Sequence, residues 1–201
     1  LKEFVKLLRA KVEYVSRGGD PRMLNGCLHV VLTGNPGAGK TTAARVLARW
    51  LHAYGLLRSG TLLERNALEL KGRHLGWTCP LVQETVAAAA GGCLFIDEAY
   101  ALCGGETERA DSFADEVLRT LLTEVEAHRA SMCVVLAGYP EAMWRLLEAD
   151  PGLQRRFPNR IELPDYTPAE LATIAVAAAR ERFGLGDDQG FEERLAEHIH
   201  L

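Results

Sequence analysis

The sequence predicts an α/β fold, a three-layer sandwich in which helices cover both faces of a five-stranded parallel sheet. Short apolar runs alternate with stretches whose apolar residues recur at helical spacing. Strands that alternate with helices form parallel sheets, because each connecting helix packs back on the sheet. We expect strands at 28–32, 61–64, 93–96, 132–137 and 160–163, and helices at 1–15, 41–54, 80–90, 111–129 and 140–149.

The pattern changes near residue 166. From Pro168 onward it is helical only, with a helix over 169–183, a Gly/Asp-rich loop over 184–190 and a further helix from Phe191. We therefore expect two domains, an α/β core over 1–165 and the start of an all-helical unit over 166–201. The chain starts inside a helical pattern without an initiator Met, so we expect a fragment whose helical unit is truncated.

Composition argues against several classes of protein. The formal net charge of −4 gives a nucleic-acid partner no electrostatic support. No apolar run approaches the roughly 20 residues of a membrane span. The five cysteines contain no C-x-x-C pair and are typical of reduced thiols. We expect an intracellular protein, in the cytoplasm or in an organelle stroma if a transit segment has been removed.

A glycine-rich loop follows the first predicted strand. Residues 34–41 read GNPGAGKT and fit G-x-x-x-x-G-K-[ST] between a strand and a helix. Such a loop turns successive backbone N–H groups toward phosphate oxygens, and the next helix adds its positive end. Lys40 is expected to reach the β- and γ-phosphates, and the Thr41 hydroxyl to bind Mg²⁺. The residues expected to bind ATP here are Gly34, Asn35, Pro36, Gly37, Ala38, Gly39, Lys40, Thr41 and Thr42.

Two acids end the third predicted strand. In Cys93-Leu-Phe-Ile-Asp97-Glu98, an apolar run leads to adjacent carboxylates. We expect Asp97 to hold Mg²⁺ through its water shell and Glu98 to polarise the attacking water. Alone, such a pair is as often a solvated turn, and the phosphate loop upstream favours the catalytic interpretation. A P-loop phosphotransferase remains an alternative. Such an enzyme transfers phosphate to a substrate hydroxyl, so it does not need a glutamate that activates water.

Five segments carry a family resemblance: 33–42, 91–100, 135–140, 150–158 and 163–168, the last reading LPDYTP. They resemble the CbbX/CfxQ clade of AAA+ ATPases, which includes red-type rubisco activase, stage V sporulation protein K and the ATPase of type VII secretion. The resemblance implies a P-loop NTPase core with a helical lid. It also implies a ring, usually a hexamer and either homo- or hetero-oligomeric, with ATP at each subunit boundary and a protein substrate at the central pore.

The resemblance assigns further roles. Arg156 matches the arginine finger, which enters the neighbouring subunit's site; Arg155 either assists it or pairs with an acid. Tyr139 falls near the position of the γ-phosphate sensor, and packing against the Pro140 turn is an equally good interpretation. A further sensor arginine of the lid is expected beyond Leu201.

The pore loop departs from the family pattern. It falls at His74 and Leu75, with His74 where an aromatic residue is usual, and Trp77 is a possible substitute. A plain surface loop is the alternative. In the helix over 111–129, the acids, among them Glu124 and Glu126, are expected mostly on the solvated side of an apolar stripe.

These sequence features leave three candidate functions. The first is a Mg²⁺-dependent AAA+ ATPase that remodels a protein partner, rubisco activation being one example in the clade. The second, favoured by the unusual His74, is a nucleotide-binding assembly or regulatory domain with little or no turnover. The third is the P-loop phosphotransferase.

Overall fold

The computed structural model describes residues 1–24, 28–71, 78–102 and 112–183 of the 201-residue chain. The predicted pore-loop residues His74 and Leu75, and the helix expected from Phe191, lie outside these ranges. The chain divides into two compact units, Leu1–Leu163 and Pro164–Leu201. Each unit is described by itself.

The first unit is built on a five-stranded sheet whose paired strands all run parallel, in the order β2-β3-β4-β1-β5. All five predicted strands are confirmed, with ends that differ by one or two residues. The three central strands β3, β4 and β1 are almost wholly buried, which matches their apolar sequences, whereas the edge strands β2 and β5 carry polar, partly exposed residues. The strands are β1 (Val30–Thr33), β2 (Leu62–Asn66), β3 (Cys93–Asp97), β4 (Cys133–Gly138) and β5 (Asn159–Glu162).

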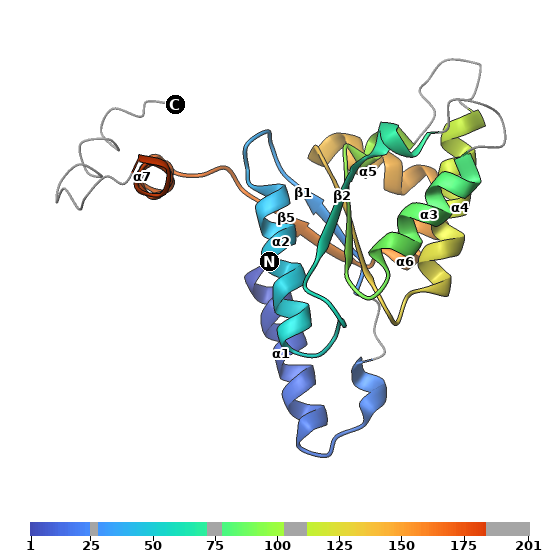
Figure 1. Ribbon diagram of the computed structural model, residues 1–201, viewed down its shortest axis with the longest axis horizontal. Helices are drawn as coiled ribbons and strands as arrows, with labels where there is room; N and C mark the ends of the chain where they lie inside the picture. The colour runs from blue at the N-terminus through green and yellow to red at the C-terminus, as the bar shows by residue number, and fades with distance from the viewer. Residues whose placement is uncertain (25–27, 72–77, 103–111, 184–201) are drawn as a thin grey trace. The chain divides into compact units, whose positions relative to one another are not determined.

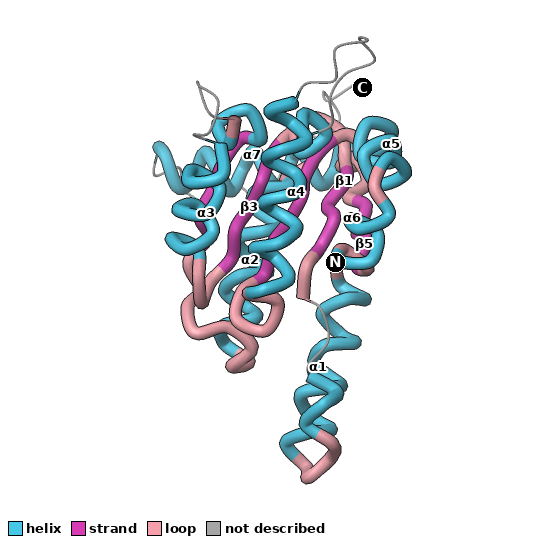
Figure 2. Tube along the Cα trace, turned by 90° about the vertical axis from the view of Figure 1, so that its right-hand side faces the viewer, coloured by secondary structure: helices cyan, strands magenta, loops and turns pink. Residues whose placement is uncertain are grey.

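Helices cover both faces of this sheet, so the three-layer prediction is confirmed (Figure 1). One face carries α1 (Lys2–Ser16) and α2 (Lys40–Ala53). The other carries α3 (Thr78–Ala89), α4 (Ser112–Ala127), α5 (Pro140–Ala149) and α6 (Pro151–Arg156). Figure 2 shows the strands side by side between the helices. The described residues of this unit also form the short 3₁₀ helices η1 (Pro21–Leu24), η2 (Ala67–Leu70) and η3 (Ala99–Leu102).

Two apolar cores lie on the two faces of the sheet. In β1, Val30 and Leu32 join the core under α1 and α2, whereas Val31 joins the core under α3 to α6. This alternation is the period of two that side chains follow along a strand. Together the cores hold the carboxyl ends of β1, β3 and β4 in place, and those ends carry the predicted site residues.

Helix α6 was not predicted, because the sequence between α5 and β5 indicates a loop. The Asp150 side chain starts this helix: its Oδ1 accepts hydrogen bonds from the backbone N–H groups of Gly152 (2.6 Å) and Leu153 (3.3 Å). Pro151 occupies the first helical position, where its missing N–H costs nothing. Arg156 therefore lies in the last turn of a helix.

The second unit contains α7 (Pro168–Phe183). Glu170 caps its start, accepting from the backbone N–H and the hydroxyl of Thr167, both at 2.9 Å. Across the described parts of both units, no helix is long and apolar enough to cross a bilayer.

Candidate active site

Most of the predicted nucleotide-binding residues line one cavity at the carboxyl ends of β1, β3 and β4. Its volume is about 320 Å³. Ligands of open α/β sheets bind at this edge of the sheet, where loops leave the strands. The lining residues are Pro36, Gly37, Gly39, Lys40, Thr41, Thr42, Asp97, Glu98, Tyr100, Gly138 and Tyr139.

The loop between β1 and α2 has the geometry of an anion cradle. Gly37 and Gly39 have φ angles of 79° and 81°, in the left-handed region that favours glycine. Gly39 is the N-cap of α2, and no side chain caps that helix end. The first N–H groups of α2 have no partner inside the helix, so they can bind an anion there.

Lys40 is held over this loop. Its Nζ donates to the backbone carbonyls of Gly34 (2.8 Å) and Asn35 (3.0 Å) and lies 5.4 Å from the centre of the Tyr139 ring. The loop also packs tightly at Gly34, where a Cβ would lie 3.0 Å from the Leu163 carbonyl oxygen. The ammonium group is thus positioned at the mouth of the cradle by backbone atoms.

Asp97 and Glu98 face the same cavity from β3. Glu98 has a φ of 52°, a conformation that is costly for a residue with a side chain, and its N–H donates to Asp97 Oδ1 at 2.9 Å. Thr41 and Asp97 also line an adjoining polar cavity of about 240 Å³ toward β2. A carboxylate and a hydroxyl on one cavity wall are the kind of oxygen ligands that Mg²⁺ takes together with phosphate oxygens.

Asn66, which binds Glu98, was not predicted from the sequence. Its Nδ2 donates to Glu98 Oε2 at 2.9 Å, while its Oδ1 caps η2 by accepting from Leu68 N–H at 2.9 Å. The cap determines the orientation of the amide, because only its nitrogen can donate to a carboxylate. The available signal was the pattern Asn66-x-x-Glu69, a capping box directly after a predicted strand.

Two tyrosines form one wall of the cavity. The rings of Tyr100 and Tyr139 stack with centroids 5.7 Å apart. Burial raises the pKa of the Tyr100 phenol, and the negative charges of Glu98 and Asp97 raise it further. Gly138 makes room for this wall, since a Cβ there would lie 2.9 Å from Tyr100 Cδ1 and 2.8 Å from Met143 Sδ.

Some predicted residues do not line the cavity. Gly34, Asn35 and Ala38 belong to the loop but do not line the cavity, and Ala38 is buried.

Arg156 does not line the cavity either. Its Nε lies 3.3 Å from Glu126 Oε2 of α4, and its Nη1 donates to the Gly152 carbonyl at 3.4 Å. Because Glu126 is 45% exposed, this ion pair adds at most about 1 kcal/mol to stability.

Comparison with known proteins agrees with this arrangement. Residues 30–165 match the model of the family described as "ATPase family associated with various cellular activities (AAA)". The chain belongs to the AAA family. The match covers the whole sheet and the cavity described above.

Relatives and a solved structure agree with this assignment. The chain is 42% identical over 154 residues to "Protein CfxQ" of Xanthobacter flavus, covering 77% of this chain and 48% of that protein. It is 41% identical over 148 residues to "Protein CbbX" of Cereibacter sphaeroides, covering 74% and 47%. The predicted resemblance to the CbbX/CfxQ clade is confirmed. A crystal structure of the FIGL-1 AAA domain in complex with ADP shares the fold, with a TM-score of 0.66 at 17% identity, covering 98% of this chain and 63% of that one.

The chain spans about half the length of these curated relatives. The family and the fold are therefore shown for this AAA domain. The substrate and the assembly partners of the whole protein are therefore proposals.

Proposed function

We propose that this AAA domain binds ATP with Mg²⁺ in the cavity at the carboxyl edge of the sheet and hydrolyses it. We further propose that each site lies at a boundary between subunits of a ring, a hexamer by family resemblance, and that turnover is coupled to remodelling of a protein partner. The observation that carries the proposal is the convergence of Lys40, Thr41, Asp97 and Glu98 on one cavity.

Each of these residues has a distinct role in the proposal. The amides at the start of α2 and the Lys40 ammonium bind phosphate oxygens. Thr41 and Asp97 hold the magnesium ion, which neutralises phosphate charge when bound. Glu98 orients and polarises the attacking water, and Asn66 holds Glu98 in place. Within the described residues, no cluster of three or more His, Cys, Asp or Glu side chains forms a metal site, which fits an ion held largely by phosphate and water.

The cavity itself favours a shared site. Among the described residues that line it, Lys40 is the one cationic side chain. Charge that develops on a transferred phosphoryl group is commonly stabilised by an arginine as well. Arg156 is 20% exposed and does not line its own chain's cavity. We infer that Arg156 completes the site of a neighbouring subunit.

A mixing experiment in the intact protein tests this proposal. Lys40→Ala should abolish nucleotide binding, and Arg156→Ala should bind ATP but turn it over about a thousand times more slowly. Mixed in equal amounts, the two inactive variants should regain about a quarter of wild-type turnover, because some boundaries then pair an intact Lys40 with an intact Arg156. Arg145→Ala, at an exposed position of α5, is the control and should retain activity.

The outcomes separate the candidate functions. Phosphate release by the wild type no faster than by Glu98→Gln would favour a nucleotide-binding assembly without turnover. Transfer of the terminal phosphate to an acceptor other than water would indicate a phosphotransferase. Absence of recovery in the mixture, with both variants assembled, would refute a shared site.

A further inference from the structure

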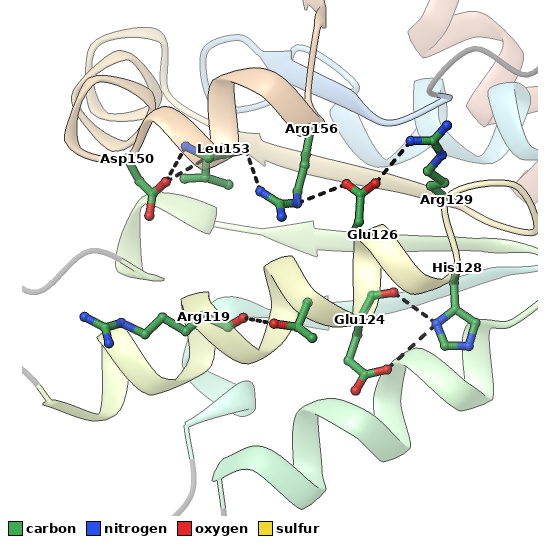
Figure 3. A network of polar contacts seen from close by, with 10 residues as sticks. Arg119, Glu124, Glu126, His128, Arg129, Asp150, Leu153 and Arg156 are labelled. Carbon is green, nitrogen blue, oxygen red and sulfur yellow. Dashed lines mark hydrogen bonds and ion pairs between the residues drawn. The ribbon is translucent and has the colours of Figure 1, made fainter.

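Arg156 is held by contacts that have no part in the nucleotide cavity of its own chain. Figure 3 shows its guanidinium group directed toward the end of α4, where its Nε lies 3.3 Å from Glu126 Oε2. Glu126 Oε1 also accepts a hydrogen bond from Arg129 Nη1 at 3.1 Å. One carboxylate, expected from the sequence to lie on a solvated helix face, therefore joins two arginines.

The backbone that carries Arg156 is fixed independently of this ion pair. Asp150 caps the start of α6. Leu153 and Phe157 are fully buried, at 0% exposure each. What remains to be set is the long side chain of Arg156, which has several rotatable bonds and loses much entropy when it is ordered.

Contacts with α4 and within α6 order that side chain. Glu126 Oε2 lies 3.3 Å from Nε, and Nη1 donates to the Gly152 carbonyl at 3.4 Å. Gly152 also leaves room for the group, since a Cβ at this position would lie 3.2 Å from Arg156 Nη1. An arginine has five N–H groups, so it can donate to phosphate oxygens while these two contacts persist.

We propose that Glu126 is a positioning residue for Arg156: it orients the guanidinium group so that the arginine enters a neighbouring subunit's site already ordered. Because the Glu126 end of the ion pair is 45% exposed, the pair contributes little to stability. The ion pair instead reduces the conformational entropy that the Arg156 side chain loses when it enters the neighbouring subunit's site. Such pre-organisation raises the rate of ATP hydrolysis, because this step requires the guanidinium group in one orientation. This inference rests on the proposed shared site.

The chain offers a matched control on the same helix. Glu124 lies two residues before Glu126 and contacts other groups, accepting from Gln83 Nε2 at 3.1 Å and lying 3.8 Å from His128 Nδ1. Figure 3 shows it apart from Arg156, beside His128. Glu124→Ala removes the same charge from the same helix without touching Arg156.

The test measures steady-state ATP turnover, melting temperature and ring assembly of the intact protein. Glu126→Ala should lower kcat about tenfold with little change in KM, whereas Glu124→Ala should stay within about twofold of wild type. Glu126→Gln should recover part of the loss, because its amide oxygen can take the place of Oε2 beside Nε and attract the guanidinium group. All three variants should assemble and melt close to the wild type.

A double variant separates positioning from a direct role. Because Glu126 is proposed to act only through Arg156, Glu126→Ala combined with Arg156→Ala should be no slower than Arg156→Ala alone. An unchanged or raised kcat in Glu126→Ala, an equal loss in Glu124→Ala, or an additive loss in the double variant would overturn the inference. Normal turnover by Arg156→Ala would instead overturn the proposed shared site, so the two failures are distinguishable.

Discussion

The stability of this domain should depend on pH through one buried histidine. His29 precedes β1 and is 1% exposed. Its Nδ1 accepts a hydrogen bond from the Val134 backbone N–H at 3.0 Å, so the neutral ring carries its proton on Nε2. A second proton would have to go on Nδ1, where it would face the Val134 donor. The ring also packs against Phe157, with centroids 5.5 Å apart.

Burial lowers the pKa of His29 from 6.5 to about 4, although the Val125 backbone and the Glu126 charge favour the protonated form. The unfolded chain therefore takes up a proton that the folded domain refuses. Stability is complete above the unfolded pKa near 6.5 and falls as the pH drops toward about 4. At about 1.4 kcal/mol per pKa unit the full loss is about 3 kcal/mol, of which about 2 kcal/mol falls between about pH 7 and about pH 5.

The assay is urea unfolding of the wild type and His29→Asn at both pH values. The Asn amide oxygen can still accept from Val134, but the side chain does not titrate. Any loss of packing in the variant is present at both pH values and cancels from the difference. We expect the wild type to lose about 2 kcal/mol more than the variant between about pH 7 and about pH 5.

Carboxylates that titrate over the same range contribute equally to both proteins, so they also cancel. An NMR titration of the His29 ring gives the folded pKa directly. Equal losses in the two proteins, or a folded pKa near 6.5 for His29, would refute the reasoning.

Three further predictions concern the cavity. Glu98→Gln should slow ATP turnover at least about a hundredfold, since the lost group is proposed to activate water, and should leave ATP affinity, measured by calorimetry, within about threefold of wild type. Equal losses of affinity and turnover would contradict this proposed role. Asn66→Ala removes both the hydrogen bond to Glu98 and the cap of η2. The free energy of unfolding, measured by denaturant titration, should therefore fall by about 2 kcal/mol. A change below about 0.5 kcal/mol would contradict this prediction. Gly138→Ala places a Cβ 2.8 Å from Met143 Sδ and should cost about 2 kcal/mol by the same measurement, whereas a more stable variant would show that the wall relaxes freely.

Contacts between distant residues were not predictable in the same way as the motifs. Asn66 and Glu98 are 32 residues apart. They meet because β2 and β3 pair with Asn66 beside Asp97, a register that no local pattern specifies. Arg156 was predicted as a functional residue, but neither the helix α6 nor the Glu126 contact was, because Asp150-Pro151-Gly152 indicates a turn as readily as a helix start.

The sequence by itself determined the layered fold and located the glycine-rich loop and the two strand-end acids. These features are local: apolar periodicity identifies strands and helices, and the chemistry of residues 34–42 and 97–98 lies in contiguous stretches. Only the tertiary structure decided which side chains hold the site residues, such as Asn66 on Glu98 and Glu126 on Arg156. The physical reason is that a hydrogen bond or ion pair depends on distances and directions within a few ångströms, and these arise only when the packed sheet and helices bring separate segments together.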